Sequence, residues 1–156
     1  VIREGNYTNP PAGFAPIMRY CDTLPLSQNK QTMKKFLKAT NYLLQKGNFV
    51  LVYPEESMWW NYRKPRPLQN GAFRFAVKNH VPVIPIFVTM QDSDQIGEDG
   101  FPIQIHTVHI KEPIYADEKL DDKQNIEKMK EENFNIWKNI YESVYGIALK
   151  YETENI

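Results

Sequence analysis

Residues 49–60 read FVLVYPEESMWW, and this stretch decides which fold the sequence favours. The run FVLVY at 49–53 is apolar and β-favouring, without alternation between apolar and polar residues. Strands buried on both faces of a parallel sheet have this pattern. The run leads directly into Glu55, Glu56 and Ser57. We therefore expect a polar site at the carboxyl end of a buried strand, where sites form in parallel sheets; the simpler alternative is a strand end followed by an irregular loop.

The rest of the chain alternates between strand and helix patterns. The expected elements are a short strand at 23–26, a helix at 30–46, the strand at 49–53, a helix at 70–78, strands at 81–88 and 103–110, and a long helix capped by Asp121 or Asp122. This order predicts an α/β fold over residues 1–156, a single domain with a largely parallel central sheet flanked by helices. QDSDQIGEDG, between the last two strands, is expected to be a loop, and KYETENI a frayed tail.

The bulk composition excludes several classes of protein. Nineteen basic side chains balance nineteen acidic ones. No global field therefore attracts nucleic acid, and contact with a membrane needs a local patch. Cys21 is the only cysteine and is expected to pack in the interior; an intrachain disulfide is excluded, and nothing demands an oxidising compartment. No apolar run approaches the roughly 20 residues that span a bilayer.

A cluster of cations follows the two glutamates. Arg63, Lys64 and Arg66 are spaced by prolines, which hold the chain extended. Their charged groups converge less easily on one another than on a shared anion, and a phosphate would suit them. A helix starting at Gly71 would direct its backbone amides to the same place. The spacing leaves open the alternative of a solvated basic loop paired with the glutamates.

The three histidines do not predict a metal site or a catalytic pair. His106 and His109 are three residues apart in an expected strand, so their side chains should face opposite sides. His80 lies at an expected helix-to-strand turn, where a capping or surface role is the simplest interpretation. Trp59 and Trp60 suit a membrane interface or the edge of a core equally well. No metal is expected.

The stretch LVYPEESMWWNYRKPRPLQNGAFRFAVKNHVPVIPIFV at 51–88 resembles the core of the glycerolipid acyltransferase family, which includes the 1-acylglycerol-3-phosphate acyltransferases. The family's third motif is an apolar strand ending Phe-Pro-Glu-Gly-Thr-Arg-Ser, which resembles VYPEESMW here. Its next segment, Lys-x-Gly-Ala-Phe and then Val-Pro-Ile-Ile-Pro-Val, resembles QNGAF and VPVIPIFV. The helix at 30–46 and the strand ending in KEPI also fall where the family has them, so the resemblance covers most of the chain.

The resemblance implies an acyltransferase of phospholipid synthesis. Such an enzyme moves a fatty acyl group from acyl-coenzyme A or acyl carrier protein to the hydroxyl of a lysophospholipid or glycerol phosphate. No cofactor is implied, because the thioester donor is already activated. The implied location is cytoplasmic, peripheral or anchored to a membrane through parts absent from this chain. The resemblance implies that Glu55, Ser57 and Gly71 bind substrate. Three cations that the family directs at the acceptor's phosphate are missing from their usual places, and we expect the nearby Arg63, Lys64 and Arg66 to bind substrate in their stead.

The sequence also departs from the family. The family's base is the histidine of a His-x-x-x-x-Asp motif, and no histidine here has an aspartate five residues later. Because the family places this motif upstream, we expect the amino-terminal portion that carries it to be absent from this chain. Glu56, Met58, Gln69 and Leu26 stand where the family has glycine, arginine, lysine and arginine. The acceptor's identity therefore stays open, as does the alternative of a non-catalytic lipid-binding or regulatory module on the same fold.

Overall fold

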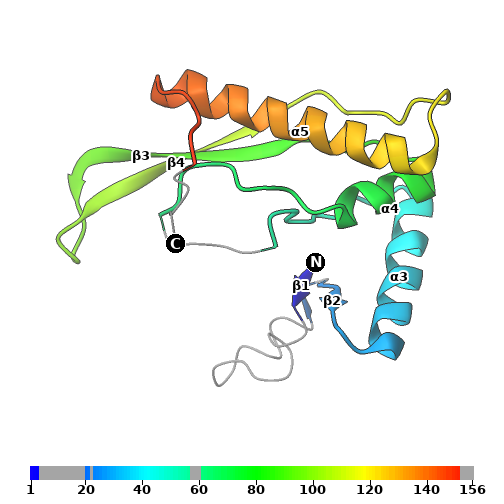
Figure 1. Ribbon diagram of the computed structural model, residues 1–156. Helices are drawn as coiled ribbons and strands as arrows, with labels where there is room; N and C mark the ends of the chain where they lie inside the picture. The colour runs from blue at the N-terminus through cyan, green and yellow to red at the C-terminus, as the bar shows by residue number, and fades with distance from the viewer. Residues whose placement is uncertain (4–19, 22, 57–60, 152–156) are drawn as a thin grey trace, which may run out of the picture. The chain divides into compact units, whose positions relative to one another are not determined.

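The computed structural model describes residues 1–3, 20–21, 23–56 and 61–151 (Figure 1). The chain divides into two compact units, Val1–Tyr53 and Pro54–Ile156. It mixes helix and strand, as expected, and its elements are β1 (Ile2–Arg3), β2 (Pro25–Leu26) and α3 (Lys30–Gln45) in the first unit, and α4 (Gly71–Asn79), β3 (Ile86–Ile96), β4 (Pro102–Ile110) and α5 (Asp122–Tyr145) in the second.

Helix α3 dominates the first unit and has the ends that its sequence predicts. The Asn29 side chain accepts hydrogen bonds from the backbone amides of Gln31 and Thr32, at 2.9 and 3.2 Å, and so caps the first turn. After the last turn, Gly47 takes a positive φ of 77° that costs glycine little. The apolar face turns inward, where the side chain of Phe36 is buried.

The core of the second unit lies between α5, α4 and one face of the β3–β4 hairpin (Figure 1). The rings of Phe87 on β3 and Trp137 on α5 lie 5.4 Å apart between centroids. At the end of α5, the Tyr145 hydroxyl donates to the Met90 carbonyl at 3.0 Å and accepts from the Met90 amide at 2.9 Å. The buried apolar residues are Leu68, Phe73, Ala76, Val77, Phe87, Ile114, Met129, Trp137, Ile140 and Tyr141.

Helix α5 is the longest element, and its start was predicted correctly. Asp121 caps it: its side chain accepts from the Gln124 amide at 2.8 Å, and the Gln124 side chain accepts from the Asp121 amide at 3.1 Å. This reciprocal pair is a capping box. Gly146, with φ of 66°, ends the helix.

The structure does not support a largely parallel central sheet. Within the described ranges, the longer sheet is the antiparallel pair β3–β4, and parallel pairing is confined to β1 and β2. Residues 97–101 join β3 to β4, and a connection this short allows only antiparallel pairing. A hydrogen bond of 2.8 Å from the Gly97 amide to the Phe101 carbonyl closes the turn, and Gly100 adopts a φ of 81°.

Three expected boundaries also differ from the structure. The run FVLVY at 49–53 is not a strand, and no strand of the described chain pairs with it. The strand expected at 81–88 starts only at Ile86, because Pro82 and Pro85 have no amide hydrogen to donate to a ladder. Residues 91–96, expected in a loop, extend β3, and Gln91, Asp92 and Ile96 pair with β4 before the chain turns.

Candidate functional site

The predicted substrate-binding residues lie on the loop that leads into α4, residues 54–70, and at the first position of that helix. Two hydrogen bonds draw the ends of this loop together. The Gln69 amide donates to the Pro54 carbonyl at 2.8 Å, and the Arg66 amide donates to Oε1 of Glu55 at 2.6 Å. The structure therefore brings Glu55 close to the start of α4.

Glu55 occupies a half-buried position in this loop. Burial raises the pKa of its carboxyl above the usual value, and the hydrogen bond and positive charge of Arg66 offset this only in part. A carboxylate offers about four lone-pair positions, of which the Arg66 amide uses one. Glu55 can therefore accept further hydrogen bonds, such as those of a bound hydroxyl.

Glu56 stands where the glycerolipid acyltransferase family has glycine, and the backbone conformation at this position explains why glycine is favoured there. Its φ is 56°, in the left-handed region that glycine enters without a Cβ penalty. The loop thus keeps a conformation suited to glycine although the glycine is replaced. Ser57, together with Trp59 and Trp60, lies outside the described residues.

The cations of the loop do not converge on one point in this structure. Arg63 donates from Nη2 to Oδ1 of Asp92 at 2.6 Å and to Oε1 of Gln104 at 3.3 Å, both on the hairpin. Lys64 donates from Nζ to the Lys150 carbonyl at 3.0 Å. The Arg63–Asp92 pair is solvent-exposed, and such pairs are typically worth no more than about 1 kcal/mol. A bound phosphate can therefore compete for the guanidinium.

Gly71 is the first residue of α4, and the space above it is open. A Cβ at this position would meet no heavy atom within 4 Å. The preceding residue, Asn70, does not cap the helix: its side chain donates to Oε1 of Glu127 at 2.9 Å and accepts from Nζ of Lys130 at 2.8 Å. The Asn70 side chain therefore does not use the first amides of α4, and a helix start of this kind favours an anion.

Two of the three histidines lie on β4, and His80 is the C-cap residue of α4. Oγ1 of Thr89 lies 2.9 Å from Nε2 of His109, on the hairpin face that also carries Phe87. His106 is exposed and pairs with Met90, so the two strand histidines face opposite sides, as predicted. In the part of the chain that the structure describes, no three His, Cys, Asp or Glu side chains are grouped to hold a metal ion.

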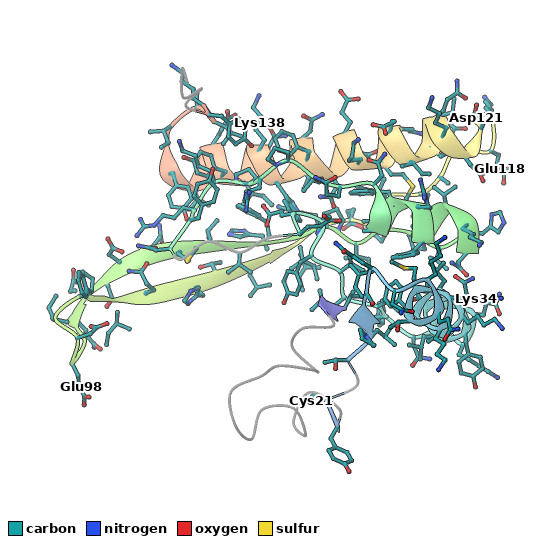
Figure 2. The ribbon with its side chains drawn as sticks, turned by 60° about the horizontal axis from the view of Figure 1, so that its bottom comes forward. Cys21, Lys34, Glu98, Glu118, Asp121 and Lys138 are labelled. Atoms are coloured by element: carbon teal, nitrogen blue, oxygen red, sulfur yellow. The ribbon has the colours of Figure 1, made fainter. Side chains whose placement is uncertain are left out.

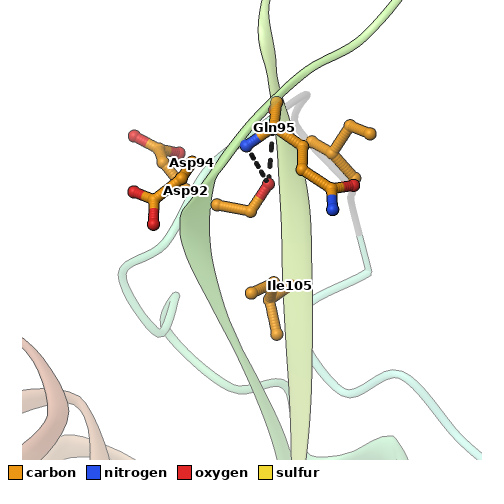
Figure 3. Close-up of a pocket in the computed structure, with 6 residues that line it drawn as sticks. Asp92, Asp94, Gln95 and Ile105 are labelled. Carbon is orange, nitrogen blue, oxygen red and sulfur yellow. Dashed lines mark hydrogen bonds between the residues drawn. The ribbon is translucent and has the colours of Figure 1, made fainter.

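A hollow of about 430 Å³ on the hairpin is a poor candidate for the site (Figure 3). Asp92 and Asp94 point to the same side of β3 (Figure 3), and Asp92 is already paired with Arg63. The hollow includes none of the predicted substrate-binding residues and no histidine. Its lining is Asp92, Ser93, Asp94, Gln95, Ile103 and Ile105.

Tyr151, expected in a frayed tail, is instead held by a hydrogen bond to the loop. The Tyr151 hydroxyl donates to the Pro65 carbonyl in the loop at 2.6 Å. An aromatic residue near a chain end, outside any periodic segment, gave no signal of such a contact. The packing expected for Cys21 was also wrong, since this side chain is exposed.

A family model described as Acyltransferase matches residues 6–89, more than half of the chain. The matched range contains Glu55 and Gly71, and it spans the boundary between the two compact units at Tyr53 and Pro54. No curated protein and no solved structure matches the chain. The match includes the stretch 51–88, whose motifs carry the resemblance described above.

Proposed function

Because this chain belongs to the Acyltransferase family, we propose that its reaction moves a fatty acyl group from an acyl thioester to the hydroxyl of a lysophospholipid or glycerol phosphate. The donor is acyl-coenzyme A or acyl carrier protein, and the product enters phospholipid synthesis. Acyl transfer in general is the activity of the family, whereas the identity of the donor and the acceptor is what we propose.

The observation that carries the proposal is the environment of Glu55. This carboxylate occupies the glutamate position of the family's third motif, is half-buried, and is held by the Arg66 amide at 2.6 Å. Its second oxygen can accept a hydrogen bond from an acceptor hydroxyl. We assign no base within these 156 residues, since none of the three histidines has the aspartate partner that the family uses.

The acceptor's phosphate has three candidate cations and a helix start near Glu55. Arg63 and Lys64 are held only by an exposed ion pair and a backbone carbonyl, respectively, and either contact can be exchanged for a contact with phosphate. Arg66 and the start of α4 at Gly71, which the Asn70 side chain does not cap, complete the set. In this proposal Ser57 also hydrogen-bonds the acceptor.

The test is an acyl-transfer assay on the intact protein with both donor types and a panel of lysophospholipids and glycerol 3-phosphate. Glu55→Ala removes a hydrogen-bond acceptor that carries charge, worth about 1.5–3 kcal/mol, so the rate should fall by about 10- to 150-fold. The exposed Glu112→Ala is the matched control and should keep wild-type activity. Activity of Glu55→Ala within a few-fold of wild type would refute the assigned role.

A second candidate function is a non-catalytic lipid-binding or regulatory module on the same fold. The replacement of the motif's glycine and arginine by Glu56 and Met58 favours it, as does the lack of the family's histidine motif in these residues. The same panel discriminates between the two. Binding of a lysophospholipid without transfer from either donor would support the module and overturn the enzyme.

We also propose that the protein works peripherally at an anionic membrane surface on the cytoplasmic side. None of the helices in the described ranges is long and apolar enough to cross a bilayer. Helix α3 contains no acidic residue, and Lys34 projects away from it into solvent (Figure 2). A lysine near an anionic bilayer contributes about 1 kcal/mol to binding. The lysine face of α3 consists of the exposed Lys30, Lys34, Lys35 and Lys38.

This proposal is tested by sedimentation with vesicles that contain phosphatidylserine or only phosphatidylcholine. Changing all four residues of the lysine face to glutamine should weaken binding to the anionic vesicles by at least about tenfold. The matched control changes the exposed Lys78, Lys111, Lys119 and Lys123 to glutamine. Equal losses in the two variants would mean that the lysine face has no special role.

A further inference from the structure

The chain after α5 turns back and is anchored in the second unit (Figure 1). We call residues 146–151 the strap. Gly146, with φ of 66°, turns the chain out of the helix. Leu149 packs against the core, and its amide donates to Oε1 of Glu142 at 2.8 Å. The strap is therefore fixed at its middle before it reaches the loop that carries Glu55.

The end of the strap binds that loop at two neighbouring residues. The Lys150 carbonyl accepts from Nζ of Lys64 at 3.0 Å, and the Tyr151 hydroxyl donates to the Pro65 carbonyl at 2.6 Å. Pro65 is itself among the most deeply buried side chains. Burial, followed by the neighbouring Tyr62, Glu55 and Tyr141, raises the pKa of Tyr151 to about 12. The hydroxyl thus stays protonated, and remains a donor, at neutral pH.

The Pro65 carbonyl and the Arg66 amide belong to one peptide group. Tyr151 binds its oxygen, and Glu55 binds its N–H at 2.6 Å. Donation to the carbonyl polarises the peptide group and makes its N–H a stronger donor, so the two bonds reinforce each other. The adjacent Pro65 and Pro67 restrict the backbone on both sides of Arg66, which leaves few other orientations for this peptide.

We propose that Tyr151 is a positioning residue for Glu55: by fixing the Pro65–Arg66 peptide, it sets the orientation of the carboxylate that receives the acceptor hydroxyl. The clamp formed by Tyr151, this peptide and Glu55 rests on geometry alone. Only its last step, the effect on acceptor binding, rests on the proposed function. The substitution that isolates it is Tyr151→Phe, which removes the hydroxyl and keeps the ring.

The first measurement is hydrogen exchange of the Arg66 amide in the intact protein. Prolines lack an amide hydrogen, so between Pro65 and Pro67 the exchange signal comes from Arg66 alone. Tyr151→Phe should speed its exchange by about 3- to 10-fold, the change expected from losing one hydrogen bond. The matched control is Tyr145→Phe, which loses two hydrogen bonds to Met90 and should leave Arg66 unchanged. Unchanged exchange in Tyr151→Phe, or equal acceleration in both variants, overturns the clamp.

The second measurement is steady-state kinetics with oleoyl-coenzyme A and oleoyl lysophosphatidate. Tyr151→Phe should raise KM for the lysophosphatidate by about 3- to 10-fold and leave KM for the donor unchanged. A general loss of stability would instead lower the apparent kcat through the smaller amount of folded enzyme and leave both KM values unchanged. Faster Arg66 exchange with an unchanged acceptor KM overturns the link from clamp to substrate. Absence of transfer by the wild-type protein overturns the proposed function instead, and the exchange result still decides the clamp.

Discussion

Glutamine and alanine at position 55 should have different effects on stability. Glu55→Gln keeps an oxygen that can accept the hydrogen bond from the Arg66 amide, but it removes the buried charge. Glu55→Ala removes both. Because burial dominates the raised pKa of Glu55, the charge costs the folded state free energy at neutral pH. At pH 7 we expect Glu55→Gln to be at least as stable as the wild type and Glu55→Ala to be less stable than both.

The size of the alanine effect follows from the bond that is lost. Without Glu55, the Arg66 amide loses its partner at 2.6 Å in a half-buried loop. An unsatisfied buried donor costs about 1–3 kcal/mol. The free energy of unfolding should therefore fall by about this amount in Glu55→Ala. In Glu55→Gln the hydrogen bond to the Arg66 amide becomes weaker because its acceptor is neutral, but the cost of burying a charge is removed. The net change in the free energy of unfolding is therefore small or stabilising.

The direction in which stability changes with pH shows whether the Glu55 charge stabilises or destabilises the fold. The folded-state pKa of Glu55 lies above its usual value of 4.5, so the folded protein binds this proton before the unfolded chain does. The stability that Glu55 contributes is therefore complete below pH 4.5 and is lost as pH rises through the folded-state pKa. Asp92 and Asp117 have lowered pKa values and act in the opposite direction. Their effect is common to wild type and variant and cancels in the difference.

The assay is urea unfolding of wild type and Glu55→Gln at several pH values from 4 to 7, with the difference in unfolding free energy taken at each pH. This difference should shift in favour of glutamine as pH rises. A difference that shifts towards the wild type over the same range would mean that the Glu55 charge is stabilised in the fold, contrary to our reasoning. Equal destabilisation by glutamine and alanine at pH 7 would also contradict it.

Two further predictions concern backbone geometry. Glu56→Gly should raise the free energy of unfolding by about 1 kcal/mol, because φ of 56° strains any residue with a Cβ; thermal unfolding measures this, and a loss of stability would argue against the strain. Asp121→Ala should lower the stability by about 1 kcal/mol through loss of the α5 cap, whereas Asp122→Ala, one residue further on, should cost less. Similar losses in these two variants would mean that the capping box contributes little.

The helices could be predicted from the sequence because their signals are local. Asn29 and Gly47 bracket α3, and Asp121 and Gly146 bracket α5, all within a residue or two of the helix they delimit. Strand pairing is different, since an apolar run specifies burial but not a partner. The run at 49–53 therefore gave a false strand, and the polar end of β3 gave a false loop.

The same distinction between local patterns and tertiary contacts applies to the candidate site. Motif spacing located Glu55 and Gly71, and the structure places both at the closed ends of one loop. The partners of Arg63 and Lys64 could not be read from the loop, because Asp92 and Lys150 come from segments 29 and 86 residues away. Tyr151 was missed for the same reason. Contacts over such distances depend on tertiary packing and leave no periodic trace in the sequence.

A structural and a functional role for Glu55 predict different residues at this position. If the only task were to accept the Arg66 hydrogen bond, glutamine would serve at least as well and would avoid the cost of a half-buried charge. A carboxylate whose pKa is raised by burial instead costs stability, and proteins accept such costs mainly where the charge is needed for binding or chemistry. The clamp through Tyr151 is consistent with a functional role for Glu55. The Tyr151 hydroxyl contributes little to the packing of the core, but it orients the Pro65–Arg66 peptide and so fixes the orientation of the Glu55 carboxylate. Loss of acyl transfer without loss of stability in Glu55→Gln would therefore separate the two roles in one protein.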